Sequence, residues 1–210
     1  MKILIIGASQ GTGAHLARLA LERGHQVTAF SRNPYSLGIQ HSGLRLRSGS
    51  MHDIAAVQAA VPGHEAVVIT ASSRRLQDFR NQPDFFSLGT QLVIDAMHSN
   101  GVRRLSVQSA FGVGDSLPLM NFAGQLFVRW FLTIPFADHE RQEQIVRASS
   151  LDWTIVRPMR LTDGRARGRF KRETGPTRLP LSISRADVAA FHLEALETDQ
   201  WLGKTVHIGG

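Results

Sequence analysis

Glycines near the amino terminus have the spacing of a phosphate-binding loop. They follow a short apolar run, residues 2–6, and precede an apolar pattern with helical periodicity. Glycine at such positions permits a tight turn and lets backbone N–H groups approach a pyrophosphate at the helix amino terminus. The alternative is a strand-to-helix turn without a ligand, but the strand–loop–helix context makes the signal strong. We predict dinucleotide binding by Gly7, Ser9, Gln10, Gly11, Thr12 and Gly13.

The end of the next predicted strand bears on which dinucleotide is bound. Folds that prefer NAD place a carboxylate here for the ribose hydroxyls. This chain has Ser31 and Arg32 instead, and residues 28–34 contain no acidic side chain. An arginine suits a 2′-phosphate through bidentate, charge-assisted hydrogen bonds, although a solvated loop arginine is the alternative. The sequence therefore predicts that NADP(H) is preferred over NAD(H).

A basic segment lies closer to the carboxyl terminus. Residues 157–178 contain eight Lys or Arg and two Asp or Glu, so they carry +6 of the net charge of +7. Such a segment indicates either an anionic ligand or a solvated, mobile face. We expect no nucleic acid partner, because the chain has no nucleic-acid-binding motif and few aromatic residues near these arginines.

Strands and helices alternate along the chain. The patterns predict strands at residues 2–6, 26–30, 44–47, 66–69, 104–108, 153–157 and 205–208. They predict helices from the glycine loop to Gly24 and at 53–61, 89–99, 138–148 and 184–196, the last opened by a Ser184/Asp187 capping box. This order predicts an α/β fold with a doubly wound, Rossmann-type parallel sheet and helices on both faces. The long connections 31–43, 72–85 and 159–181 should gather at the ligand edge.

Length and composition bound the remaining possibilities. The 210 residues, 42% of them hydrophobic, fit one NAD(P)-binding domain over residues 1–210, with substrate loops at 109–136 and 157–182. No apolar run is long enough for a membrane span or a signal peptide, so we expect a soluble, cytoplasmic protein without a membrane partner. The absence of cysteine excludes disulfides and thiolate metal sites. The nine histidines lack ligand spacing, so no metal is expected.

Seven segments together resemble one known family. The chain looks like an atypical short-chain dehydrogenase/reductase of the NAD(P)H-binding group that contains NmrA-like proteins and biliverdin-IXβ/flavin reductases. The segments that carry the resemblance are 2–13, 31–34, 89–104, 109–112, 150–158, 184–189 and 203–206. The resemblance covers essentially the whole chain. Gln10 stands where the group usually has a middle glycine, which shifts the loop's spacing.

The resemblance implies further cofactor contacts. Asp53 would approach the adenine, and it can also act as a helix N-cap. Ser109 would face the nicotinamide and the substrate carbonyl; alternatively its hydroxyl satisfies backbone groups at the strand end. The remaining implied cofactor contacts are Thr70, Ala71 and Ser72 on the adenosine side, with Ala110, Arg157 and Pro158 beside the nicotinamide.

One departure from the family pattern concerns the proton donor. Short-chain dehydrogenases generally use a Tyr-x-x-x-Lys pair, in which tyrosine donates the proton. Here Pro135 and His139 occupy the corresponding places, and Tyr35 is the only tyrosine of the chain. This argues against alcohol-dehydrogenase or epimerase chemistry. A planar conjugated acceptor, such as a flavin, quinone or biliverdin-like molecule, delocalises the incoming charge and does without a strong protein acid.

Candidate residues for such a substrate follow. Aromatic side chains could form its walls, Arg160 and its basic neighbours could receive a phosphate or propionate, and His139 could donate a proton or be structural. We take Ser109 and His139 as catalytic candidates and Phe111, Phe122, Phe136 and Arg160 as substrate candidates. The helical spacing of Phe127, Trp130 and Phe131 favours a place in the core. A non-catalytic NADP(H) sensor of the NmrA-like type is the alternative to a reductase.

Overall fold

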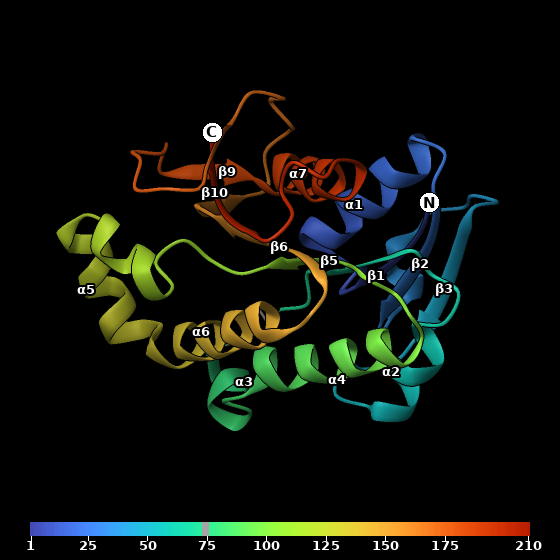
Figure 1. The fold of residues 1–210 in the computed structure, drawn as a ribbon. Coiled ribbons are helices and arrows are strands. Elements are labelled where there is room, and N and C mark those ends of the chain that lie inside the picture. Colours follow the sequence, from blue (N-terminus) through green and yellow to red (C-terminus); the bar gives the residue numbers. More distant parts are fainter. Residues whose placement is uncertain (73–75) are drawn as a thin grey trace.

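One mostly parallel sheet organises the molecule. A computed structural model describes residues 1–72 and 76–210 (Figure 1). Eight strands lie in the order β3-β2-β1-β4-β5-β6-β10-β8, and all neighbours are parallel except β10 and β8. A second, two-stranded sheet pairs β7 with β9. The strands are β1 Lys2–Ile6, β2 Gln26–Ser31, β3 Leu44–Ser48, β4 Ala66–Ile69, β5 Arg104–Gln108, β6 Asp152–Pro158, β7 Arg160–Thr162, β8 Lys171–Glu173, β9 Ser182–Ser184 and β10 Lys204–Gly209.

Helices cover both faces of the sheet, as Figure 1 shows. On one face lie α1 (Gly11–Glu22) and α7 (Arg185–Glu197); on the other lie α2 (Ile54–Ala60), α3 (Leu76–Asn81), α4 (Phe85–Ser99) and α6 (Thr133–Ala148). Alternate residues of β1 serve the two layers, Ile3 and Ile5 facing α1 and Leu4 and Ile6 facing α2 and α4. A strand buried on both faces needs the continuous apolar run seen in the sequence. The doubly wound fold is confirmed.

Two helices begin earlier than their patterns predict. α4 begins at Phe85 rather than Gly89, and α6 at Thr133 rather than Asp138. The buried carboxylate of Asp138, in α6, accepts hydrogen bonds from the backbone N–H groups of Phe86 and Ser87 at 2.5 and 3.3 Å. The first turn of α4 is therefore capped by another helix. A cap supplied from 52 residues away leaves no local sequence signal.

Several short elements had no periodic signal. They are α3, the three-residue strands β7, β8 and β9, and two 3₁₀ turns, Pro34–Leu37 and Gly114–Leu119. The helix α5 (Phe122–Phe131) forms where the spacing of Phe127, Trp130 and Phe131 is helical. The 159–181 connection thus contains strands, and β8 closes the far edge of the sheet by pairing antiparallel with β10. The predicted capping box does open α7, because Asp187 N–H donates to Ser184 Oγ at 3.0 Å.

A buried histidine between β5 and α7 makes stability depend on pH. His192 is fully buried, its Nδ1 lies 2.8 Å from Ser106 Oγ, and burial lowers its pKa to about 3. In the unfolded chain it titrates near 6.5, so below that pH the unfolded state binds the extra proton. We expect His192 to cost about 2 kcal/mol of unfolding free energy on going from pH 7 to pH 5.

The measurement is urea unfolding at both pH values for the wild type and His192→Gln. The variant should lose about 2 kcal/mol less between pH 7 and 5, while the exposed His98→Gln serves as the control and should match the wild type. If His192→Gln and the wild type lost the same unfolding free energy between pH 7 and pH 5, the lowered pKa of His192 would not be a source of the pH dependence.

Candidate functional site

A cavity of about 820 Å³ opens at the carboxyl ends of the strands. It lies where the strand order reverses, between β1 and β4, which is where ligands bind in open α/β sheets. Most of the predicted cofactor residues meet here. Those that line the cavity are Gly7, Ser9, Gln10, Gly11, Thr12, Ser31, Arg32, Thr70, Ala71 and Ser72.

The glycine loop packs directly against the chain that follows β4. A Cβ atom added to Gly7, whose φ is +91°, would lie 2.6 Å from the backbone N and Cα of Ala71. A Cβ on Gly13 would overlap the Gly7 carbonyl oxygen and lie 2.6 Å from Thr70 Oγ1. Gly13 does not line the cavity. Its absent side chain instead allows the loop and strand ends to close into a backbone cradle.

The start of α1 is left open toward this cradle. The N-cap residue Gln10 is extended and makes no side-chain cap, and the first turn of the helix contains no acidic residue. The first N–H groups of a helix have no partner within it, and together with the helix dipole they attract an anion. The arrangement fits the pyrophosphate of a dinucleotide.

Polar side chains lie at the end of β2, and one of them is buried without a hydrogen-bond partner among the described residues. The hydroxyl oxygen of Ser31 is buried and makes no hydrogen bond within the described part of the chain. Arg32, Asn33 and Ser36 line the cavity beside it, and none of the lining residues at this end is acidic. A buried hydroxyl without a partner is costly, so a ligand phosphate or ribose would satisfy it.

Sequence reasoning missed a pair of tilted aromatic rings and a methionine beside that end. Met51, His52 and Phe85 line the cavity, and the rings of His52 and Phe85 are 4.9 Å apart. His52 Nε2 donates to the Phe85 carbonyl oxygen at 2.8 Å, which fixes the imidazole. The position of Met51 and His52 after β3 could have predicted this, because residues 49–52 follow that strand at the same sheet edge as the glycine loop. Asp53 does not line the cavity; its carboxylate accepts from Ala56 N–H at 3.1 Å as the N-cap of α2.

Arg185 was also missed as a cavity residue. It is the first residue of α7, and its Cδ lies 3.4 Å from where a Cβ of Gly11 would be. Its Nη1 donates to Asp163 Oδ1 at 2.7 Å, and both residues line the cavity. The 157–182 loop is thereby tied to the glycine loop at the cavity wall. The Ser184/Asp187 capping box predicts where α7 begins, but it does not indicate where the Arg185 side chain lies.

A buried ion network lies just beyond the cavity, at the ends of β5 and β6. Ser109 Oγ donates to Glu143 Oε1 at 2.6 Å, and the Arg157 guanidinium donates to both carboxylate oxygens at 2.8 and 2.6 Å. Asp115 and Arg147 extend the network at 2.7 and 2.6 Å. Burial lowers the pKa of Arg157, but the contacts with Glu143 outweigh it, so the pKa is raised.

The predicted residues Ser109, Ala110, Arg157 and Pro158 do not line the cavity, which reaches Gln108, the residue before them. The hydroxyl proton of Ser109 is engaged by Glu143. The remaining lone pairs of Ser109 Oγ can accept a hydrogen bond from a ligand N–H, but this hydroxyl cannot at the same time donate to a substrate oxygen. Gln108 Oε1 is buried and has no partner within the described residues.

His139 lies between α4 and α6. Its ring stacks on Phe86 at 3.7 Å and 19°, and its Nδ1 lies 2.8 Å from Gln142 Oε1. Burial lowers its pKa, although Gln142 and the carboxylates of Glu143 and Asp138 act in the opposite direction. His139 does not line the cavity.

The substrate candidates divide between the interior and the surface. Phe111 is buried with its ring edge-on to His207 at 5.3 Å, and the Phe136 ring lies 3.1 Å from where a Cβ of the adjacent Gly112 would be. Phe122 and Arg160 are exposed. The structure thus brings Phe111 and Phe136 to the same loop and leaves the other two at the surface.

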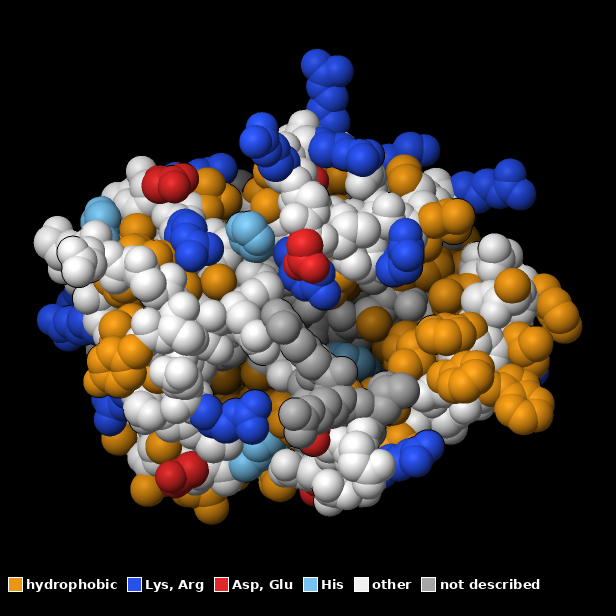
Figure 2. Space-filling view, turned by 180° about the vertical axis from the view of Figure 1, so that it is seen from behind, with side chains coloured by type: hydrophobic (Ala, Val, Ile, Leu, Met, Phe, Trp, Pro, Cys, Tyr) orange, Lys and Arg blue, Asp and Glu red, His pale blue; other side chains and the backbone are white. Residues whose placement is uncertain are grey.

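The expectation that α5 packs its aromatic residues in the core is wrong. Phe127, Trp130 and Phe131 are 53, 75 and 62% exposed, because α5 buries Val128 alone among its residues. Figure 2 shows apolar side chains gathered at this end of the molecule, on the right of the view. The helical spacing was correct, but the face it marks has no protein partner within the described residues.

The basic segment is partly structural. Arg157 belongs to the buried network, and Arg172 pairs with Glu194 at 2.8 Å and lies 4.1 Å from the centre of the Phe170 ring. The Asp187 carboxylate accepts from the backbone N–H groups of Arg167 and Gly168 at 2.9 to 3.1 Å, which anchors the loop. The exposed cations are Arg160, Arg165, Arg167, Arg169, Lys171 and Arg178. None of the helices among the described residues is both long and apolar enough to cross a membrane.

Comparisons with known proteins agree with this geometry. A family model described as NAD(P)H-binding matches residues 7–199. The 2-alkyl-3-oxoalkanoate reductase of Stenotrophomonas maltophilia (strain K279a) is 37% identical over 108 residues, which are 50% of this chain. The matched residues cover 32% of that reductase, so the similarity spans about a third of its length.

Solved structures extend the similarity over the whole chain. ChuY, an anaerobilin reductase from Escherichia coli O157:H7, is 25% identical, with a TM-score of 0.79 and coverage of 100% of this chain and 97% of ChuY. A short-chain dehydrogenase/reductase from Veillonella parvula DSM 2008, solved in complex with NADP, has a TM-score of 0.85. It is 16% identical over 100% of this chain and 94% of its own, which shows a shared fold.

Proposed function

We propose that this chain, which belongs to the NAD(P)H-binding family, is an NADPH-dependent reductase that passes hydride to a planar conjugated acceptor. That it is an NAD(P)H-dependent oxidoreductase agrees with the reductases to which it is similar. The bound cofactor would supply the hydride. The glycine cradle and the start of α1 would hold its pyrophosphate, and Ser31 and Arg32 its 2′-phosphate.

The choice of acceptor rests on the state of the groups at the ends of β5 and β6. The Ser109 hydroxyl donates its hydrogen bond to Glu143, the Glu143 carboxylate is paired with Arg157, and His139 is buried against Phe86. Tyr35, the only tyrosine, is 72% exposed in the connection between β2 and β3. Ser109, Glu143 and His139 are therefore engaged and Tyr35 does not line the cavity, so none of these groups is placed to protonate an alkoxide there. An acceptor that delocalises the charge, such as a flavin, quinone or biliverdin-like molecule, needs no such donor.

The protein's contribution is then binding and orientation. Gln108, with its unpartnered Oε1 at the cavity wall, and the Ser109 oxygen can accept hydrogen bonds from ligand N–H groups. Phe111 and Phe136 supply apolar surface near the strand end, and the exposed cations at 160–171 attract an anionic substituent. Alignment of donor and acceptor by such contacts is a recognised source of rate enhancement.

A direct test is to add riboflavin, FMN, a quinone and biliverdin in turn to the protein and NADPH. The proposal expects saturable NADPH oxidation with at least one of these acceptors. Simple ketones with NADPH, and secondary alcohols with NADP⁺ in a separate assay, should give no turnover, because their reactions need the missing acid–base residue. Turnover of a ketone with no turnover of any conjugated acceptor would contradict the proposed class.

A non-catalytic NADP(H) sensor is the second candidate. It is favoured by the same observation, the engagement of Ser109, Glu143 and Arg157 with one another. It predicts tight NADPH binding with no oxidation by any acceptor in the series. Binding and turnover measured on one sample therefore separate the two functions.

Cofactor preference gives a quantitative prediction for Arg32. Its guanidinium lines the cavity without an acidic partner in the described chain, so Arg32→Ala should weaken NADPH binding by roughly 1–3 kcal/mol and leave NADH binding nearly unchanged. Fluorescence titrations with both cofactors measure this. Arg23→Ala, at the opposite end of α1, is the matched control. Equal losses of affinity for NADPH and NADH would contradict a contact between Arg32 and the 2′-phosphate.

A further inference from the structure

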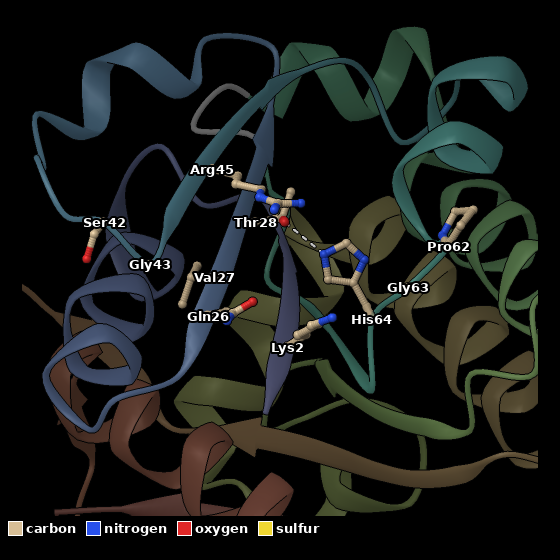
Figure 3. A pocket seen from close by; sticks show the side chains of 10 residues that line it. All are labelled: Lys2, Gln26, Val27, Thr28, Ser42, Gly43, Arg45, Pro62, Gly63 and His64. Atoms are coloured by element: carbon tan, nitrogen blue, oxygen red, sulfur yellow. Dashed lines mark hydrogen bonds between the residues drawn. The ribbon is translucent and has the colours of Figure 1, made fainter.

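A second cavity lies at the amino-terminal ends of the strands, across the sheet from the first cavity. It has a volume of about 260 Å³ and is bounded by the amino-terminal ends of β1, β2 and β3 and by the loop between α2 and β4 (Figure 3). β1 separates it from the glycine loop by five residues, or roughly 15 Å at the rise of a strand. It is therefore distinct from the cofactor cavity.

This cavity exists because α2 is short. Leu4 and Phe30 pack in the core cluster beneath α2 and α4, and the residues two positions earlier, Lys2 and Thr28, lie on the same face of the sheet. α2 ends at Ala60 and leaves that part of the face open. Arg45 of β3 is directly opposite Thr28 in the strand register. Three neighbouring strands thus present an ammonium, a hydroxyl and a guanidinium on one surface.

The cations of this surface are not neutralised. None of the residues that line the cavity is acidic. Within the described part of the chain, neither Lys2 Nζ nor the guanidinium of Arg45 or Arg47 has an ion-pair or hydrogen-bond partner. Glu65, the acidic residue that follows His64, accepts from the Lys2 backbone N–H at 2.7 Å. Figure 3 shows the Lys2 and Arg45 side chains reaching toward Thr28 and His64.

His64 completes the cavity and has a defined hydrogen-bonding pattern. Its Nδ1 lies 3.1 Å from the Val61 carbonyl oxygen, which can only accept, so Nδ1 carries the proton. Its Nε2 lies 2.8 Å from Thr28 Oγ1. Burial lowers the pKa of His64, and Arg45 and Arg47 lower it further. The other charged groups around it are Lys2 and Glu65. An anion in the cavity would offset the positive charges and favour protonation of His64.

We propose that this cavity is a binding site for a small phosphate-class anion, either inorganic phosphate or a terminal phosphate monoester. Lys2 and Arg45 would donate to its oxygens. When His64 is protonated, its Nε2–H donates to Thr28 Oγ1, which would free the Thr28 hydroxyl proton to donate to the anion. Donors from three strands suit a tetrahedral, doubly charged group better than a planar carboxylate. The lining holds no Phe, Tyr or Trp ring on which a base could stack, so the site would recognise the phosphate itself.

The test is calorimetric titration with inorganic phosphate of the protein saturated with NADP⁺, which occupies the cofactor cavity. Ionic strength is held constant with chloride, and acetate is titrated for comparison. We expect saturable phosphate binding that is about tenfold weaker in Arg45→Gln, with acetate binding more weakly than phosphate in the wild type. Arg23→Gln, near the same sheet edge but outside the cavity, should bind phosphate like the wild type.

A second readout follows the ring of His64 by NMR through a pH titration. Phosphate should raise the pKa of His64 in the wild type and not in Arg45→Gln. Because Arg45 is exposed, its replacement should leave the fold intact, which circular dichroism checks. Phosphate binding that occurs only without NADP⁺, or equal binding in Arg45→Gln and the wild type, would overturn the proposal. The titration that saturates the protein with NADP⁺ measures cofactor binding by itself, so a failure of cofactor binding is distinguished from a failure of phosphate binding.

Discussion

Glu143→Gln is expected to destabilise the protein by about 3–5 kcal/mol, the range for breaking a buried ion pair from one side. Glu143 is fully buried and accepts hydrogen bonds from Ser109, Arg147 and both nitrogens of the Arg157 fork that face it. The neutral amide would leave the Arg157 charge in the interior with the exposed Asp115 as its remaining acidic partner in the described structure. Urea unfolding at neutral pH measures the loss.

Two further variants make this result specific. Glu140→Gln, on the exposed side of α6, should change the unfolding free energy by less than about 0.5 kcal/mol. The double variant Glu143→Gln/Arg157→Met should be more stable than Glu143→Gln alone, because it no longer buries an unpaired charge. A loss below about 1 kcal/mol in Glu143→Gln would mean that the network is not a tightly held structural unit.

Gly7→Ala is expected to destabilise the protein by about 2–5 kcal/mol, from left-handed backbone strain together with overpacking. The new methyl group would lie 2.6 Å from the Ala71 backbone, where no flexible side chain can move aside. NADPH affinity should fall as well, because separating the loops after β1 and β4 opens the cradle. Unfolding without cofactor and NADPH titration measure the two effects.

Gly24→Ala provides the matched control. Gly24 has a similar φ of +80°, but a Cβ there would meet nothing within 4 Å. It should lose roughly 1–2 kcal/mol from backbone strain alone and bind NADPH normally. Equal stability losses in the two variants would show that the approach of Gly7 to Ala71 contributes nothing to the fold.

Local signals were sufficient for most of the architecture. The apolar run at residues 2–6, the glycines at 7, 11 and 13 and the stop at Gly24 each belong to one short stretch of chain and depend on backbone geometry that neighbouring residues impose. All seven predicted strands form and lie side by side in one sheet. The loop residues of the predicted cofactor site meet at the switch between β1 and β4 because parallel topology places successive strand ends at one edge.

Contacts between segments that are distant in the chain could not be predicted from such local signals. The Asp138 carboxylate that caps α4 and the Glu143 carboxylate that engages Ser109 both come from α6, 52 and 34 residues away in the chain. Their types and spacing on α6 resemble those of ordinary solvent-facing acids. The same holds for the aromatic face of α5, since periodicity identifies an apolar face but does not say whether another element covers it.

The sequence by itself therefore determined the doubly wound sheet, the glycine-rich loop after β1 and the serine and arginine at the end of β2, because each depends on residues close together in the chain. Tertiary structure alone decided that Ser109 and Arg157 join Glu143 in a buried network, that His139 stacks on Phe86, and that Lys2, Arg45 and His64 face one cavity. The physical reason is that burial and electrostatic pairing depend on which elements pack together, and side-chain pairs far apart in sequence leave no periodic trace.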